Sequence, residues 1–130
     1  MTDIQNLEDI KTFVNNFYSK VQKDELLAPK FAQRIDSDDW PRHLNRMYDF
    51  WNTILFYDRS YSGNPFSKHV GLGAEPMHFE RWKSLFTSTI DEHFQGIIAD
   101  EAKSRAEKMA ALFSSKLQYM RDNPGFKTIV

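Results

Sequence analysis

Apolar side chains recur every three or four residues in four stretches of the chain, which is the spacing of a buried helical face. The stretches cover residues 7–21, 40–55, 76–89 and 102–120. A half-buried strand would instead alternate apolar and polar residues, and no such alternation is sustained along the sequence. The pattern therefore predicts an all-α fold with four principal helices.

Polar and turn-forming residues indicate where these helices begin and end. Asn6 is a good N-cap for the first helix, and Asp9 three residues later favours its first turn. The polar cluster 36–39 precedes the second helix, which Pro41 opens in a position where proline is tolerated. The residues Asn123-Pro124-Gly125 are expected to end the last helix.

Residues 58–76 lack a sustained helical pattern and are dense in turn signals. They hold three of the five glycines of the chain, Gly63, Gly71 and Gly73. One or two helical turns fit around Phe66 to Val70. A loop of this length in a compact domain usually has a function, so we expect part of the functional site here.

Composition and charge exclude several classes of protein. The chain has 130 residues, which is the length of one domain, so we expect a single domain over residues 1–130. With 17 basic and 18 acidic residues the net charge is −1, which argues against a nucleic-acid-binding module. No uncharged run exceeds eight residues, so no membrane span is expected. The absence of cysteine and of a signal-peptide pattern at the N-terminus fits the cytoplasm.

Aromatic residues are unusually frequent, at 15% of the chain. Each aromatic ring can bury about 150–250 Å² of surface. This content is typical of a well-filled core, and it also suits a pocket for a large, flat, apolar ligand. Composition alone leaves both interpretations open.

The four histidines are the first candidates for chemistry. His43 lies on the apolar face of the second helix, and His69 lies among apolar residues in the glycine-rich segment. A histidine on a short element in such surroundings could be presented to a cofactor as an axial ligand. His78 and His93 lie near the two ends of the third helix, where we expect surface positions.

Other site chemistries find no support. Zinc would require paired ligands such as histidines at i and i+4, and a di-iron bundle would require a second Glu-x-x-His motif. The sequence has neither of these, and it has no phosphate-binding glycine motif and no nucleophile motif. Of the site types considered, only a haem pocket uses two histidines together with aromatic residues that carry polar tips, such as Tyr18 and Trp82.

Four separated patterns in this order make the chain resemble the third group of bacterial truncated haemoglobins. The residues that carry the resemblance are Phe17 and Tyr18; His43, Met47, Phe50 and Trp51; Gly63, Asn64, Pro65, His69 and Leu72; and Phe79, Arg81, Trp82, Leu85 and Phe86. The resemblance covers nearly the whole chain.

The resemblance implies an abridged globin, in which a two-over-two helical sandwich surrounds a haem. It implies that haem b is the cofactor and that His69 is the proximal iron ligand. The distal residues then map onto Tyr18, His43 and Trp82. The long irregular stretch before His69 fits as well, since this family replaces a globin helix there with a loop.

Neighbouring residues would complete such a pocket. The apolar walls are expected from Phe17, Met47, Phe50, Trp51, Phe66, Leu72 and Phe79, and the haem propionates are expected to meet Arg46, Lys68 and Arg81. Each of these side chains could instead serve ordinary packing or solvation away from any cofactor.

The function that follows is binding of dioxygen and related diatomic gas ligands. Strong distal donors slow ligand release, so the site would suit redox turnover of oxygen, nitric oxide or peroxide, with electrons from a separate reductase. Whether the chain has dioxygenase- or peroxidase-like activity is left open. The alternative is a non-haem all-helical interaction domain whose aromatics are all core. A haem sensor is disfavoured, because an output domain does not fit in 130 residues.

Overall fold

The computed structural model describes residues 1–125, which form helices and connecting loops with no strand. The α-helices are α1 (Leu7–Lys23), α2 (Ala28–Ala32), α3 (Trp40–Phe56), α4 (Pro76–His93) and α5 (Ile97–Asp122), and two short 3₁₀ helices cover Ser37–Asp39 and Phe66–His69. The four predicted helices are thus confirmed. None of the helices within this part of the chain has the length and apolarity needed to span a bilayer.

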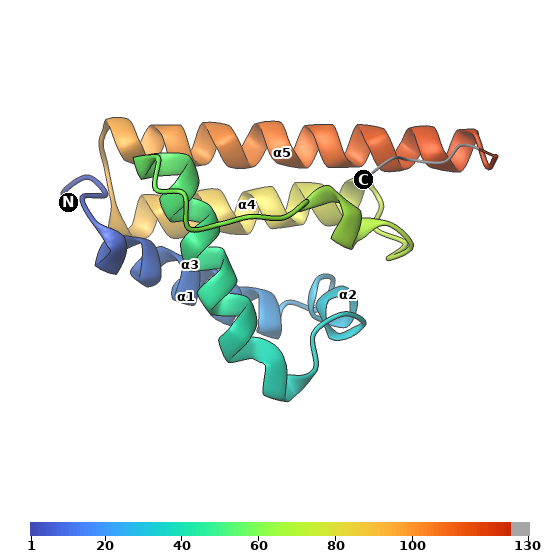
Figure 1. The fold of residues 1–130 in the computed structure, drawn as a ribbon, viewed down its shortest axis with the longest axis horizontal. Coiled ribbons are helices and arrows are strands. Elements are labelled where there is room, and N and C mark those ends of the chain that lie inside the picture. The colour runs from blue at the N-terminus through green and yellow to red at the C-terminus, as the bar shows by residue number, and fades with distance from the viewer. Residues whose placement is uncertain (126–130) are drawn as a thin grey trace.

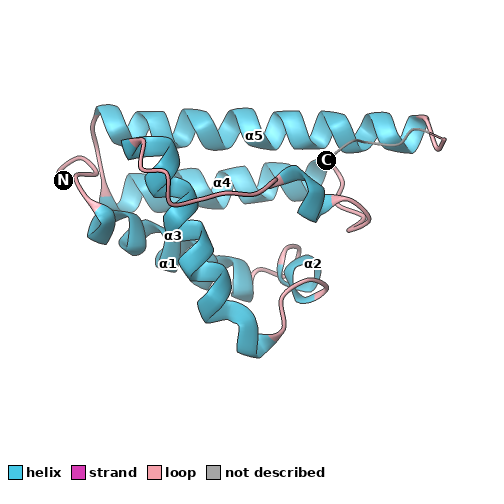
Figure 2. Ribbon diagram, in the orientation of Figure 1, coloured by secondary structure: helices cyan, strands magenta, loops and turns pink. Residues whose placement is uncertain are grey.

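The long helices form two pairs, α4 with α5 and α1 with α3. The pairs are joined because α1 also packs against α4 (Figure 1). This two-over-two arrangement confirms the predicted helical sandwich. The segment between α3 and α4 is mostly loop and crosses the molecule with one short helical turn in it (Figure 2). That turn, Phe66–His69, falls where the sequence predicted it.

The start of α1 follows local sequence chemistry, whereas the starts of α3 and α5 do not. The side chain of Asn6 accepts a hydrogen bond from the backbone N–H of Asp9 at 3.0 Å, which confirms the predicted N-cap. The polar cluster 36–39 was expected to cap α3, but no side chain of that cluster makes a capping hydrogen bond to its first turn. α5 is capped from a distance, since Asp3 accepts from the backbone N–H groups of Ile98 and Ala99.

Small residues on α5 bring the two long helices together. Ala99, Ala102 and Ala106 are fully buried, and their short side chains allow α4 and α5 to approach closely. On the opposite side of α4, Phe13 and Phe17 of α1 are buried. The core therefore lies between the two helix pairs, and its edge opens toward the segment that carries His69.

Stacked aromatic rings connect this core to the site. The Trp82 ring stacks on Phe86 with a centroid distance of 5.6 Å, and Phe86 stacks on Trp51 at 4.9 Å. The two tryptophans belong to α4 and α3, so the stack fixes these helices relative to each other.

Candidate functional site

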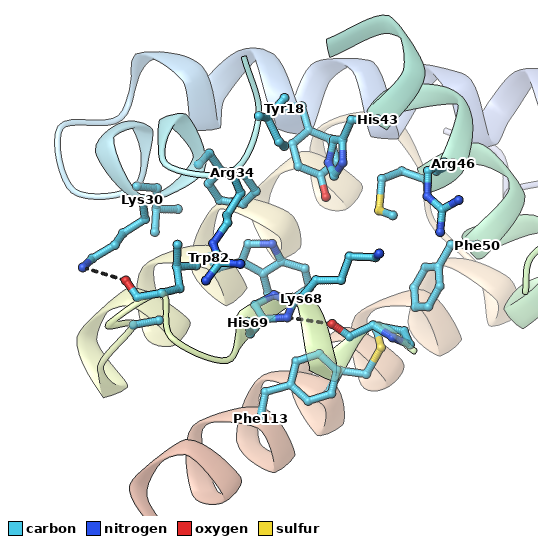
Figure 3. A pocket seen from close by; sticks show the side chains of 18 of the residues that line it. Tyr18, Lys30, Arg34, His43, Arg46, Phe50, Lys68, His69, Trp82 and Phe113 are labelled. Carbon is cyan, nitrogen blue, oxygen red and sulfur yellow. Dashed lines mark hydrogen bonds between the residues drawn. The ribbon is translucent and has the colours of Figure 1, made fainter. Parts of the chain in front are cut away.

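A cavity of about 420 Å³ lies where all five α-helices and the His69 turn meet (Figure 3). Most of its wall is apolar or aromatic, which is typical of a cofactor site. Its lining comprises Tyr18, Leu27, Lys30, Phe31, Arg34, Ile35, Asp39, Arg42, His43, Arg46, Met47, Phe50, Trp51, Tyr61, Pro65, Lys68, His69, Leu72, Ala74, His78, Phe79, Trp82, Met109, Ala110 and Phe113.

His69 lines this cavity, and one of its two ring nitrogens already makes a hydrogen bond. Its Nδ1 lies 2.8 Å from the carbonyl oxygen of Pro65, and a carbonyl can only accept, so Nδ1 carries the proton. Nε2 is then the atom with a free lone pair. Burial lowers the pKa of His69. The Pro65 hydrogen bond raises this pKa, and the nearby Arg34 charge lowers it. A neutral imidazole with this tautomer is suited to metal ligation.

His78 lines the same cavity with the opposite tautomer. We expected it at the surface, but only 8% of the residue is exposed. Its Nδ1 accepts a hydrogen bond from the backbone N–H of Glu75 at 2.9 Å, so the ring proton is on Nε2. The capping of α4 explains both the burial and the tautomer. His78 therefore offers the cavity a donor and not a lone pair.

Three polar aromatic groups meet on the other helices of the cavity. The Tyr18 ring lies edge-on to His43 at 5.0 Å, and burial raises the pKa of the Tyr18 hydroxyl. Burial, together with the Arg46 charge, lowers the pKa of His43 to about 4, so this imidazole is neutral at pH 7. Trp82 enters from α4. The structure thus brings the three predicted distal residues to one cavity.

None of these three groups has a hydrogen-bond partner among residues 1–125. Nε2 of His43 is buried, and it neither accepts nor donates a hydrogen bond within residues 1–125. Neither the Tyr18 hydroxyl nor the Trp82 indole N–H is bonded to another residue in the described part of the chain. Buried polar groups are normally hydrogen-bonded, and leaving one unpaired costs about 1–3 kcal/mol. The unpartnered, buried Nε2 of His43 therefore points to a ligand in the cavity, and the Tyr18 and Trp82 groups are free to bond the same ligand.

Of the seven residues predicted to form the apolar walls, five line the cavity and two do not. Met47, Phe50, Trp51, Leu72 and Phe79 line the cavity as expected. Phe17 does not line it and packs behind Trp82, with ring centroids 5.5 Å apart. Phe66 also lies outside the lining, in a second cluster where it contacts Phe113. Both are buried residues that support the wall from behind.

The basic residues also differ from expectation at one position. Arg46 and Lys68 line the cavity, as predicted for propionate partners. Arg81 does not, because its guanidinium pairs with the largely buried carboxylate of Asp24 at 2.9 Å. Sequence reasoning missed Lys30 and Arg34, which line the cavity from α2 and the turn after it. Their i, i+4 spacing beside Phe31 is the signal that could have located them.

Residues 1–125 offer no conventional metal cage. Within residues 1–125, no group of three or more His, Asp or Glu side chains is arranged to hold a metal ion. A metal held here through His69 must therefore bring most of its own ligands. A haem does so, and an apolar cavity that holds the free Nε2 of His69 and further polar groups without protein partners fits it.

Comparison with known proteins agrees with this geometry. Residues 3–116 match the model of the bacterial-like globin family. The group 3 truncated hemoglobin ctb of Campylobacter jejuni is 31% identical over 115 residues, covering 86% of this chain and 91% of that protein. The crystal structure of group III truncated hemoglobin from Campylobacter jejuni superposes with a TM-score of 0.82 at 29% identity, over 90% of this chain and 95% of that one.

The chain therefore belongs to the bacterial-like globins and, within them, to the third group of truncated haemoglobins. It is a haem protein that binds dioxygen and related diatomic gas ligands. The alternative of a non-haem interaction domain is not favoured, because the aromatics do not all belong to the core and many of them line a cavity.

Proposed function

We propose that residues 1–130 form a single haem domain that binds haem b with His69 as the protein ligand to iron. The observation that carries this assignment is the pair of tautomers in the cavity. The Pro65 carbonyl leaves Nε2 of His69 free, whereas the Glu75 N–H leaves Nε2 of His78 protonated. Of the two histidines, His69 alone presents a lone pair at that position.

The distal side is assigned to Tyr18, His43 and Trp82. When haem is bound, its iron supplies one open coordination position for a diatomic ligand. The Tyr18 hydroxyl and the Trp82 indole N–H then donate hydrogen bonds to the ligand. His43 is neutral and can donate through its buried Nε2 in the N–H tautomer. This assignment is supported by the absence of competing partners for these groups within residues 1–125.

Other residues shape the chemistry of the site. The apolar walls from Met47, Phe50 and Phe79 exclude water, so each donated hydrogen bond acts in a medium of low dielectric constant. Arg46 and Lys68 are assigned to the two haem propionates at the rim. A cation meeting a carboxylate there forms a charge-assisted bond, which is stronger than a neutral one.

The donor set favours turnover over delivery of the ligand. Each hydrogen bond to a bound ligand contributes about 1 kcal/mol, and more where charge develops in a dry site. Several donors together slow release, which is unfavourable for oxygen transport. We therefore assign the chain to redox chemistry on oxygen, nitric oxide or peroxide in the cytoplasm, with electrons from a separate reductase.

The visible spectrum of the purified protein tests the cofactor assignment directly. A strong Soret band and a haem b spectrum after extraction into alkaline pyridine are expected. A colourless protein that takes up no haem on titration would contradict the proposal. Stopped-flow mixing of the oxygenated protein with nitric oxide then measures turnover, and slow release without turnover would contradict the redox assignment.

A further inference from the structure

Three cations bind alternate carbonyls of the chain that follows His69, residues 70–74, here called the post-histidine segment. Two come from α2 and the turn after it, and one comes from the end of α5. The pairs are Arg34 Nη2 with the Val70 oxygen at 2.8 Å, Lys30 Nζ with the Leu72 oxygen at 3.3 Å, and Arg121 Nη1 with the Ala74 oxygen at 3.1 Å. Figure 3 shows the Lys30 bond at the edge of the cavity.

The post-histidine segment has little hydrogen bonding of its own. The N–H of Val70 reaches the Ser67 oxygen at 3.4 Å, and the N–H of Leu72 reaches the His69 oxygen at 3.3 Å. Both distances are beyond the usual range for a backbone hydrogen bond. In an α-helix these carbonyls would accept from N–H groups four residues later. Here three side chains from other elements take that place.

The glycines of the segment make this arrangement sterically feasible. Gly71 and Gly73 have φ values of +81° and +75°, which are readily adopted only by glycine. A Cβ at Gly71 would lie 3.4 Å from Arg34 Nη2, and one at Gly73 would lie 3.2 Å from Lys30 Nζ. The two glycines therefore set the direction of the carbonyls and leave room for the cations beside them.

We propose that Lys30, Arg34 and Arg121 are positioning residues that hold the His69 imidazole in its orientation toward iron. This inference rests on the proposed function, in which His69 is the ligand. His69 ends a 3₁₀ helix of four residues, which is too short to fix the ring by itself. The Pro65 hydrogen bond restrains the ring on the N-terminal side. The three cations restrain the backbone on the C-terminal side.

The restraint acts from two directions. α2 and α5 lie on opposite sides of the post-histidine segment (Figure 1), so the segment is held between them. The Arg34 bond, at 2.8 Å, has the length of a charge-assisted hydrogen bond, whereas the Arg121 and Lys30 bonds are longer, at 3.1 and 3.3 Å. Each bond joins parts of the chain at least 36 residues apart, so the position of His69 depends on the packing of both helices.

Three substitutions test the proposal in the haem-loaded protein. Arg34→Met, Lys30→Met and Arg121→Met each keep an unbranched side chain and remove the cationic donor. Arg105→Met is the matched control, because Arg105 lies on α5 like Arg121 but is not part of the cavity lining and pairs with Glu101 at 2.8 Å. Lys30→Arg keeps a cationic donor and is expected to behave like the parent.

Two measurements report on the iron ligand itself. Resonance Raman spectra of the ferrous protein give the iron–histidine stretching band, and transfer to an excess of a haem-scavenging apoglobin gives the rate of haem loss. We expect a shifted or broadened band and about three- to tenfold faster haem loss in the three variants, with both unchanged in Arg105→Met. A parent-like band and rate in all three would overturn the proposal.

The same cations could act by binding the haem propionates, and a second cofactor separates the two roles. Haem dimethyl ester lacks the propionate charges but binds the same imidazole. If the three variants still shift the band and speed loss of the ester, positioning is supported. If their effects vanish with the ester, the positioning role is overturned.

His69→Ala distinguishes failure of this inference from failure of the proposed function. A persistent iron–histidine band in His69→Ala would contradict the assignment of the ligand itself. Loss of that band in His69→Ala, together with unchanged spectra in the three Met variants, would leave the ligand assignment intact and overturn the positioning role alone.

Discussion

The imidazole of His69 is bonded to the carbonyl oxygen of Pro65, four residues earlier on the same turn, with 2.8 Å between Nδ1 and oxygen. This spacing is that of neighbouring positions on a helical surface, so the turn itself supplies the partner. The bond does more than hold the ring. Because the Nδ1 N–H donates to a carbonyl oxygen, the imidazole becomes more electron-rich, and Nε2 becomes a stronger metal ligand.

Replacing His69 and His78 separately should give opposite results. We expect His69→Ala to lose its haem or hold it loosely, since the free imidazole nitrogen is removed. His78→Ala should retain haem, because Nδ1 of His78 is occupied by the Glu75 N–H and its Nε2 carries the ring proton. Haem content per chain, measured after extraction into alkaline pyridine, checks both. The reverse pattern of retention would contradict the assignment.

Removing a distal donor should speed dioxygen dissociation. We expect Tyr18→Phe and Trp82→Phe each to raise the dissociation rate by up to about tenfold, which corresponds to about 1.4 kcal/mol. Tyr48→Phe is the matched control, because the Tyr48 hydroxyl is bonded to Asn15 away from the cavity. Stopped-flow displacement by carbon monoxide gives the rates. Rates within about a factor of two of the parent in both variants and in the double variant would exclude the donor role.

The free energy of unfolding should fall as the pH falls, because of the lowered pKa of His43. Its pKa is lowered to about 4 in the fold, against an ordinary value of 6.5. Between these values the unfolded chain takes up a proton that the folded chain does not, so acidification favours unfolding. We expect the free energy of unfolding to drop by about 1–3 kcal/mol more in the parent than in His43→Leu between pH 7 and pH 4. Urea unfolding at several pH values measures the difference, and parallel pH profiles would contradict it.

Side chains at the two left-handed glycines should disturb the site. Gly71→Val and Gly73→Val place a β-branched residue at positive φ, which costs about 1–2 kcal/mol. We expect altered Soret circular dichroism and ligand-binding rates, with little change in helix content. Gly125→Val is the control, since a Cβ there meets no atom within 4 Å. Ligand-binding rates equal to those of the parent at both positions would count against this prediction.

The helices could be predicted from sequence because their signals are local. The apolar spacing of α1, the cap at Asn6 and the break after residue 57 depend on neighbours within one or two turns. The glycine-rich segment was recognised for the same reason. The cap expected from residues 36–39 failed, because those residues form a 3₁₀ turn of their own before α3 begins.

The cavity was predicted less completely because it depends on contacts between distant parts of the chain. The burial of His78 is an exception, since its capping contact with Glu75 is local and was overlooked. Arg81 lies outside the cavity because it pairs with Asp24, which is far from it in the sequence. Nothing in the periodicity of either helix face encodes such partners. Lys30 and Arg34 acquire their role only when α2 is folded beside residues 70–74.

The aromatic stack between α3 and α4 makes the chain its own optical probe. Trp51 and Trp82 line the cavity, and the ring of Trp40 lies 5.4 Å from that of His43, which also lines it. These are the three tryptophans of the chain, so all indole emission arises close to the cofactor site. Haem absorbs in the range where indole emits, and energy transfer at such short range is nearly complete. Intrinsic fluorescence should therefore be dark in the loaded protein and appear as haem departs, which allows cofactor loss to be followed without any added label.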